Sequence, residues 1–321
     1  METAPTTKRP FFANIFLSPD EPRLRAGWRL LIQAVLMLAL AMCFGLLLNI
    51  PLAILGIWGI GELIVLEFIE LFAITLSVFL ARRLLDKRTV ASLGLKFNRY
   101  SLWDVLAGLL IAGLVMGLVY LLEWSLGWLT FEGYAWQYES PSLVQVNAAI
   151  ILLTFIMVGW SEELLFRGYY LQNLASGLTH SETNPSGRGL IWGVILSTLV
   201  FSVLHLLNPY ASWVSFVGIF LAGLFLAYGY LHTGQLWLSI GLHIGWNFFE
   251  GPVFGFPVSG MDFYRITRIT VTGPELWTGG SFGPEAGLVV LPALALGALL
   301  VYGYTVVSRE SGVERRELRR Q

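Results

Sequence analysis

Three groups of polar side chains interrupt long apolar runs of this sequence, and each contains a carboxylate or an imidazole that can transfer protons. The first group is Glu162 and Glu163, followed four residues later by Arg167. Ionisable side chains between apolar runs are costly at membrane depth, which makes them candidates for function. The spacing of Glu163 and Arg167 is that of a helical ion pair, which leaves Glu162, about 100° around the helix, to face a cavity. The alternative is a charged helix end at the membrane interface.

The second and third groups contain histidines. His205 follows Phe201 by four residues near the end of an uncharged apolar run, and His243 precedes Asn247 by the same interval. A spacing of four places the imidazole and the carboxamide of the last pair on one helical face. Taken alone, either histidine is more typical of a packing residue that makes one hydrogen bond.

Two glycines lie beside and within the third group. Gly241 and Gly245 form a small-xxx-small pattern, which predicts that a neighbouring helix approaches this segment closely. Counting about 1.5 Å per residue along each helix, the three groups reach a common depth if two of the helices project beyond the bilayer. We therefore expect a single cavity, sunk partly into the membrane, that all three groups share.

Two chemistries suit such a set. A carboxylate beside an imidazole can hold and deprotonate a water molecule, and a second histidine with an asparagine can donate hydrogen bonds to an oxyanion. Alternatively, Glu162, His205 and His243 could bind Zn²⁺ and leave one position for water. Both chemistries lead to hydrolysis of an amide bond, so these residues leave open whether Zn²⁺ is bound.

Composition indicates the elements that must position these groups. The 321 residues are 56% hydrophobic and only 13% charged, with a mean hydropathy of +0.69. That is too little polar surface to cover a soluble domain, so we expect an all-α polytopic membrane protein. The net charge of −1 argues against nucleic acid as a partner, and a single cysteine, Cys43, excludes an internal disulfide framework.

A helix needs about 20 apolar residues to span a bilayer, and this rule predicts a bundle of about eight transmembrane helices. The candidate spans are Leu30–Leu48, Gly59–Ala81, Leu102–Trp124, Leu143–Ser176, Gly189–Leu207, Trp213–Leu231, Gln235–Glu250 and Gly287–Val307. The fourth is too long for one simple crossing and the seventh is short. With both termini in the cytoplasm, 18 of the 20 Lys and Arg residues fall on the cytoplasmic side.

We therefore predict a multi-pass protein of the cell (plasma) membrane with cytoplasmic N- and C-termini. Residues 1–29 form a cytoplasmic segment, 30–307 a membrane domain with its catalytic core at 143–250, and 308–321 a basic tail. The loop 251–286 lies outside, and its alternating stretch 265–272 is a candidate hairpin.

The second predicted span carries three more carboxylates, Glu62, Glu67 and Glu70, within one arc of the helix. They could form a proton or cation path, which would suit a transporter, or make polar contacts with the outer loop. We favour the contacts, because no basic residues line other spans at that depth. The sequence also lacks the broken pair of spans typical of transporters.

The ordered motifs, on separate apolar segments, resemble those of the CPBP family, which contains Rce1-like CAAX prenyl proteases and the Abi proteins of bacteriocin processing and immunity. The motifs are Glu162-Glu163-x-x-x-Arg167, Phe201-x-x-x-His205 and His243-x-x-x-Asn247. Together they cover about a third of the chain.

This resemblance implies an eight-helix membrane core whose site faces the cytoplasm. It implies that Glu162 and His205 activate the attacking water and that His243 and Asn247 stabilise the oxyanion. Glu163 and Arg167 would then support the geometry of the site. Because both zinc-dependent and metal-free mechanisms are proposed for the family, the resemblance leaves Zn²⁺ open.

The function that follows is an intramembrane endopeptidase, a CPBP-type protease or metalloprotease. Its expected partners are membrane lipid and a membrane-associated protein or peptide substrate, prenylated or bacteriocin-like. The alternative function is a non-catalytic membrane immunity or scaffolding protein on the same fold.

Overall fold

The computed structural model describes residues 11–18, 22–56, 60–179 and 187–318. The outermost parts of the predicted cytoplasmic segments, 1–10 and 319–321, lie outside the described residues. Within the described ranges, seven helices are long and apolar enough to cross a membrane, which makes this a multi-pass, all-α membrane protein.

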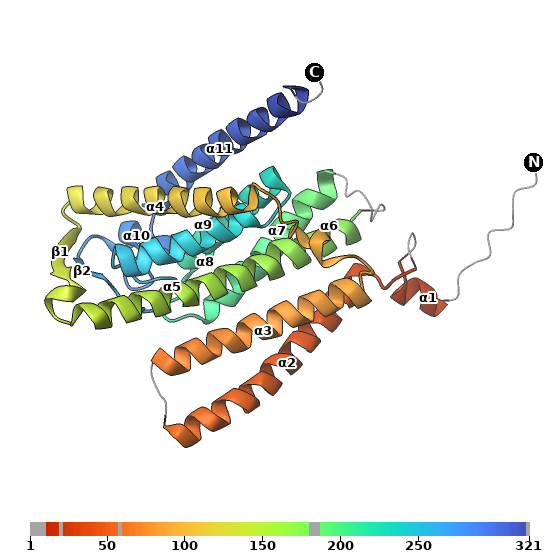
Figure 1. Ribbon diagram of the computed structural model, residues 1–321, viewed down its shortest axis with the longest axis horizontal. Coiled ribbons are helices and arrows are strands. Elements are labelled where there is room, and N and C mark those ends of the chain that lie inside the picture. Colours follow the sequence, from red (N-terminus) through yellow and green to blue (C-terminus); the bar gives the residue numbers. More distant parts are fainter. Residues whose placement is uncertain (1–10, 19–21, 57–59, 180–186, 319–321) are drawn as a thin grey trace, which may run out of the picture.

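Most of the predicted spans are present as long helices (Figure 1). They are α2 (Ala26–Leu55), α3 (Ile60–Leu84), α4 (Ser101–Ser125), α5 (Pro141–Glu163), α7 (Gly187–Leu204), α8 (Trp213–Thr233) and α11 (Val290–Leu318). The shorter helices are α1 (Phe11–Phe16), α6 (Gln172–Gly177), α9 (Trp237–Phe248) and α10 (Glu275–Thr278). Single 3₁₀ turns occupy Val90–Leu93, Ala135–Gln137, His205–Leu207 and Pro284–Ala286.

Local chemistry sets where these helices begin and end, and α8 illustrates it. Its first turn is capped by Ser212, whose hydroxyl accepts a hydrogen bond from the backbone N–H of Ser215 (3.2 Å). It ends at Gly234, which adopts a left-handed conformation with φ of 63°. The boundaries of the span therefore follow from a serine cap and a glycine stop around an apolar run.

The fourth predicted span is one continuous rod with a change of helix type. After α5 the chain forms a π-helical segment, Leu164–Leu171, and then continues as α6. Both carboxylates of the first motif lie at the end of α5, and Arg167 lies in the π-helical segment. Such segments are rare and cluster at functional sites.

The seventh predicted span differs from the expectation, because α9 has only 12 residues and is too short to cross a bilayer alone. Every residue from Leu238 to Asn247 is buried. Helix α9 packs mainly on α4 and also contacts α5 and α8, so it forms the centre of the bundle rather than a lipid-facing wall (Figure 1). A further π-helical turn, Phe249–Val253, follows it.

The close approach predicted from the glycine pair is present. A Cβ atom added at Gly241 would collide with the carbonyl oxygen of Val105 on α4, and one added at Gly245 would lie 2.9 Å from Leu109 Cα. On α4, a Cβ atom added at Gly108 would lie only 2.5 Å from the backbone nitrogen of Leu242. Gly-to-Gly contact therefore sets the α4–α9 separation and hence the position of His243.

We expect Gly241→Ala to lower the free energy of unfolding by about 1–3 kcal/mol, because the methyl group forces α4 and α9 apart. Thermal unfolding of the purified protein in detergent measures this loss. Gly303→Ala in α11 is the matched control, since nothing lies within 4 Å of its added methyl group. Equal melting temperatures for the two variants would contradict this account of the packing.

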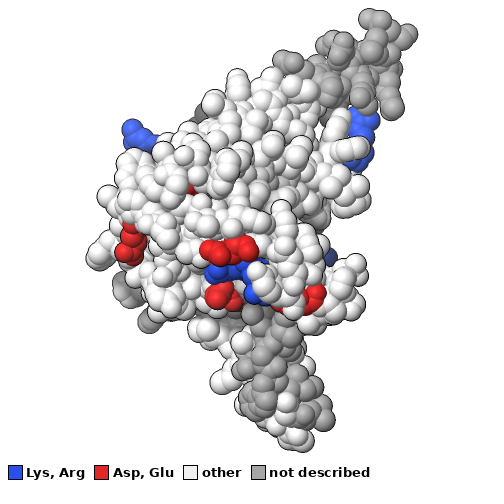
Figure 2. All heavy atoms as spheres, turned by 90° about the vertical axis from the view of Figure 1, so that its left-hand side faces the viewer, with Lys and Arg blue, Asp and Glu red and all other residues white. Residues whose placement is uncertain are grey.

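The outer loop contributes a strand, but not the hairpin expected for residues 265–272. Strand β2 (Thr267–Val271) pairs antiparallel with β1 (Leu129–Tyr134), which lies between α4 and α5. The pairing ties the α4–α5 connection to the loop that precedes α11. Figure 2 looks onto this end of the molecule and shows acidic and basic side chains close together there. Two ion pairs lie in this region, Arg268–Glu139 at 3.1 Å and Arg265–Asp262 at 2.7 Å.

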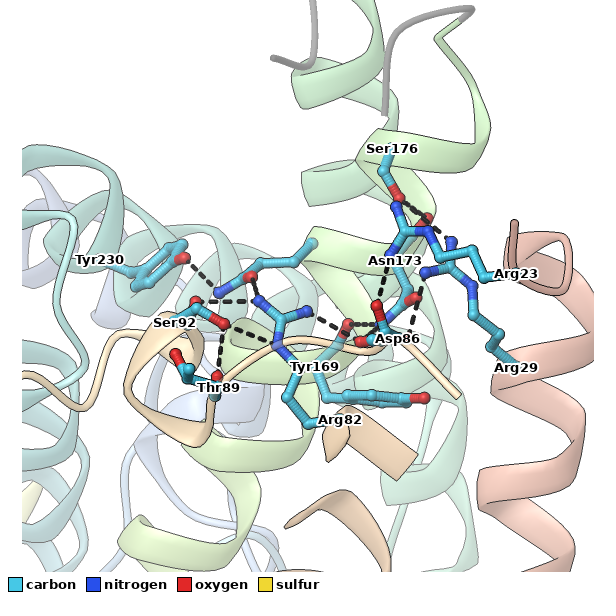
Figure 3. A network of polar contacts seen from close by, with 11 residues as sticks. Arg23, Arg29, Arg82, Asp86, Thr89, Ser92, Tyr169, Asn173, Ser176 and Tyr230 are labelled. Carbon is cyan, nitrogen blue, oxygen red and sulfur yellow. Dashed lines mark hydrogen bonds and ion pairs between the residues drawn. The ribbon is translucent and has the colours of Figure 1, made fainter. Parts of the chain in front are cut away.

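Helices α2 and α3 form a hairpin that lies against α5, and a buried polar network ties it to α6 (Figures 1 and 3). Asp86, just after α3, accepts from Arg29 of α2 (3.1 Å) and Arg82 of α3 (2.8 Å). Asn173 of α6 also donates to Asp86 (3.3 Å). One carboxylate thus joins three helices at the predicted cytoplasmic end.

Candidate active site

The acidic pair at the end of α5 forms the predicted ion pair. Glu163 Oε1 lies 2.7 Å from Arg167 Nη1, and both side chains are about 99% buried or more. Arg167 also donates to the carbonyl oxygen of Gly223 on α8 (2.9 Å), and its guanidinium lies 4.8 Å above the ring of Phe201 on α7. The guanidinium therefore holds α7 and α8 around Glu163.

His243 of α9 meets both carboxylates. Its Nδ1 lies 2.9 Å from Glu163 Oε1, and its Nε2 lies 3.6 Å from Glu162 Oε2. Because Glu163 is paired with Arg167 and can only accept, Nδ1 of His243 is the donor. Nε2 then carries a proton only when the ring is a cation, and two carboxylates beside the ring stabilise that cation.

His205 is placed by a backbone hydrogen bond. Its Nδ1 lies 2.8 Å from the carbonyl oxygen of Phe201, which can only accept, so Nδ1 carries the proton and the neutral ring has its lone pair at Nε2. The Phe201 ring lies between the two imidazoles, with centroids 4.5 Å from His205 and 6.2 Å from His243. His205 is thus suited to accept a proton or to orient water.

A cavity of about 180 Å³ brings the remaining groups together. Asn247 is only 7% exposed and lines this cavity, and among the described residues its carboxamide has no hydrogen-bond partner. Glu162, His205, His243 and Asn247 all line the cavity, whereas Glu163 and Arg167 lie behind it. Polar groups from two helices, α5 and α9, and from the turn at the end of α7 therefore face one space, although they are far apart along the chain.

Comparison with known protein families gave one match. Residues 144–249 match the family model for type II CAAX prenyl endopeptidases, Rce1-like. We call this segment the Rce1-like domain. It runs from the start of α5 to the end of α9 and so contains all six motif residues. No curated protein and no solved structure matched the chain.

The match to this family model supports protease activity in general terms.

The Rce1-like domain does not hold its predicted zinc ligands as a metal cluster. In the part of the chain that the structure describes, no group of three or more His, Cys, Asp or Glu residues is arranged to hold a metal ion. Glu162 and His243 approach each other directly, as an ion pair does. Zn²⁺ binding by Glu162, His205 and His243 therefore stays a prediction.

The cavity beside the Rce1-like domain also contains residues that sequence reasoning missed. Glu285, in the outer loop before α11, is 4% exposed and accepts hydrogen bonds from Trp246 Nε1 (3.0 Å) and the Ser259 hydroxyl. Burial raises the pKa of the Glu285 carboxyl. The only signal in the sequence was a lone carboxylate in a glycine-rich loop.

The carboxylates of α3 are not where we expected them. Glu67 and Glu70 line the catalytic cavity, and within the described residues they make no hydrogen bond to the outer loop. The side chain of Glu62 lies outside the described residues. The expectation of polar contacts is therefore corrected, because α3 turns this face towards α5 and the Rce1-like site.

A second, more apolar cavity of about 470 Å³ adjoins the first. Residues of α2, α3, the π-helical segment and α7 line it, and it shares Glu70, Glu162, His205 and Asn208 with the catalytic cavity. The Glu162 carboxylate is therefore bordered by an apolar space between the α2–α3 hairpin and α7.

Proposed function

We propose that this protein is an intramembrane endopeptidase that hydrolyses a peptide bond of a membrane-associated protein or peptide. One observation carries the proposal: Glu162, His205, His243 and Asn247 converge on one cavity inside an Rce1-like domain. Together these residues can supply a general base and hydrogen-bond donors to an oxyanion, and none of them alone suggests this chemistry.

In this proposal Glu162 is the general base, with His205 orienting the water. Glu162 accepts a proton from the water, and the new C–O bond forms at the scissile carbonyl carbon. The carbonyl oxygen becomes an oxyanion, which accepts hydrogen bonds from Nε2–H of the His243 cation and from the Asn247 carboxamide. The C–N bond then breaks, and the proton held by Glu162 passes to the leaving nitrogen.

Glu163 and Arg167 act as positioning residues. Glu163 fixes the ring of His243 through Nδ1, and Arg167 holds the Glu163 carboxylate in place. Because both side chains are buried behind the cavity, they orient the site without touching the substrate.

The apolar cavity next to Glu162 supports a membrane-anchored substrate, prenylated or bacteriocin-like. Its walls are mostly aliphatic and aromatic, so a lipid chain or an apolar helix is favoured there over bulk water. We also propose that the protein lies in the cell membrane with both termini in the cytoplasm, as the distribution of Lys and Arg predicts.

Purified protein tests this function. We expect it to cleave synthetic peptides that carry an apolar helix of about 20 residues and a short randomised flank, in detergent micelles. His205→Ala and His243→Ala should each remove cleavage while leaving the elution volume and thermal unfolding near those of the wild type. Full cleavage by both variants would refute the site. No cleavage by the wild type would favour a scaffolding or immunity role.

A further inference from the structure

Two carboxylates in the catalytic cavity have no role in the mechanism above. Glu67 and Glu70 are three residues apart on α3, so their side chains lie on one face of the helix. Both line the cavity together with Glu162 and His205. In the part of the chain that the structure describes, neither carboxylate has a hydrogen bond or an ion pair.

Acidic groups outnumber basic ones in the cavity. Four carboxylates line it, those of Glu67, Glu70, Glu162 and Glu285, and among the described residues no Lys or Arg does. Arg167 is paired with Glu163 behind the cavity wall, and the His243 ring lies against Glu162 and Glu163, so neither reaches Glu67 or Glu70 as an ion-pair partner. A carboxylate cluster in apolar surroundings is costly unless a positive charge or a proton offsets it.

Other polar groups in this space also lack partners. The carboxamide of Asn247 is more than nine-tenths buried, faces the cavity and has no hydrogen-bond partner among the described residues. Oε2 of Glu162 is buried and makes no hydrogen bond within the same ranges. These polar groups without partners indicate that a polar part of the substrate, and not only an apolar segment, occupies the cavity when substrate is bound.

We propose that Glu67 and Glu70 form a subsite for a basic side chain, Lys or Arg, of the substrate polypeptide near the scissile bond. This inference rests on the proposed endopeptidase function and adds a substrate class to it. A lysine ammonium has three donors and an arginine guanidinium has five, which match two unpartnered carboxylates.

Membrane-anchored substrates supply such residues where they are needed. Lys and Arg concentrate in the cytoplasmic flanks of apolar segments, and their long aliphatic stems lie along apolar surface while the charge reaches a polar site. The cavity combines the two requirements, because its walls include Phe155, Ile219 and Phe225 beside the carboxylates. The structure therefore suits a peptide in which a basic residue follows or precedes an apolar anchor.

The same anchored peptide pool tests this. Mass spectrometry of the products should show Lys or Arg enriched at one position relative to the cut. For a matched pair of peptides with Lys or Gln at that position, the wild type should favour Lys in kcat/KM by about tenfold or more. The double variant Glu67→Gln/Glu70→Gln should reduce that ratio to near one, and Glu70→Lys should favour a Glu peptide.

The controls separate the two proposals. Glu132→Gln removes one exposed carboxylate from β1 and should keep the Lys preference of the wild type. Cleavage without any Lys or Arg preference, or a preference unchanged in the double variant, overturns the basic subsite while the endopeptidase function stands. A wild type that cuts no member of the pool overturns both.

Discussion

Replacing Glu162 with glutamine should lower kcat by about a thousandfold, which corresponds to about 4 kcal/mol of transition-state stabilisation. Glutamine has nearly the same shape and can still accept a hydrogen bond, but it cannot take a proton from water. Glu162 lines the cavity and its Oε2 lies 3.6 Å from His243 Nε2, so the change also removes one of the two negative charges beside the imidazole. Initial rates with an anchored peptide at saturating concentration measure the effect.

The fold should survive this substitution. The Glu162 side chain is 19% exposed, whereas Glu163 is fully buried and holds Arg167. Thermal unfolding should therefore stay close to that of the wild type, and Glu132→Gln should keep both activity and stability. A Glu162→Gln variant with more than a tenth of wild-type kcat would assign the base to another residue.

The second large effect concerns stability. Asp86→Ala should lower the free energy of unfolding by about 3–5 kcal/mol, because it removes a buried carboxylate from two guanidinium partners. Asp86 Oδ1 lies 3.1 Å from Arg29 and Oδ2 lies 2.8 Å from Arg82, and these three side chains are at most 3% exposed (Figure 3). The lost charge also removes the acceptor for Asn173, so the contact between α3 and α6 weakens.

Denaturant titration of the purified protein in detergent measures this loss. Asp262→Ala is the matched control, because Asp262 is 81% exposed and pairs with Arg265 at 2.7 Å. Exposed pairs contribute about 0–1 kcal/mol, so the control should differ little from the wild type. If Asp86→Ala and Asp262→Ala unfold at the same denaturant concentration, the buried network does not stabilise the fold.

Spacing along the chain predicted much of the candidate site. An interval of four residues gave the Glu163–Arg167 pair, and the order of the motifs placed both histidines in one cavity with Glu162. These successes have a common physical reason: ionisable groups inside apolar runs must find one another or a cavity. Apolar length likewise predicted the long helices, since a bilayer fixes the length a span needs.

What the sequence did not predict depends on contacts between distant segments. Leu129–Tyr134 is a short stretch with a glycine inside it, and nothing local marks it as the partner of Thr267–Val271. Glu285 reaches the cavity because the loop before α11 folds back, with Gly279 and Gly283 at positive φ. The face that α3 turns towards the site depends on its packing against α5, and the arc of carboxylates on α3 does not reveal whether that face meets a loop or a cavity.

The π-helical segment Leu164–Leu171 constrains how the chain length can vary. Glu162 and Glu163 face α9 just before it, and Asn173 reaches Asp86 just after it, within a single uninterrupted rod. Successive residues of an α-helix are rotated by about 100° about its axis. Deleting one residue here would therefore turn Asn173 away from Asp86 and Ser176 away from Arg29. Related sequences should therefore vary in length at the turns between helices and keep an invariant residue count from the carboxylate pair to Asn173.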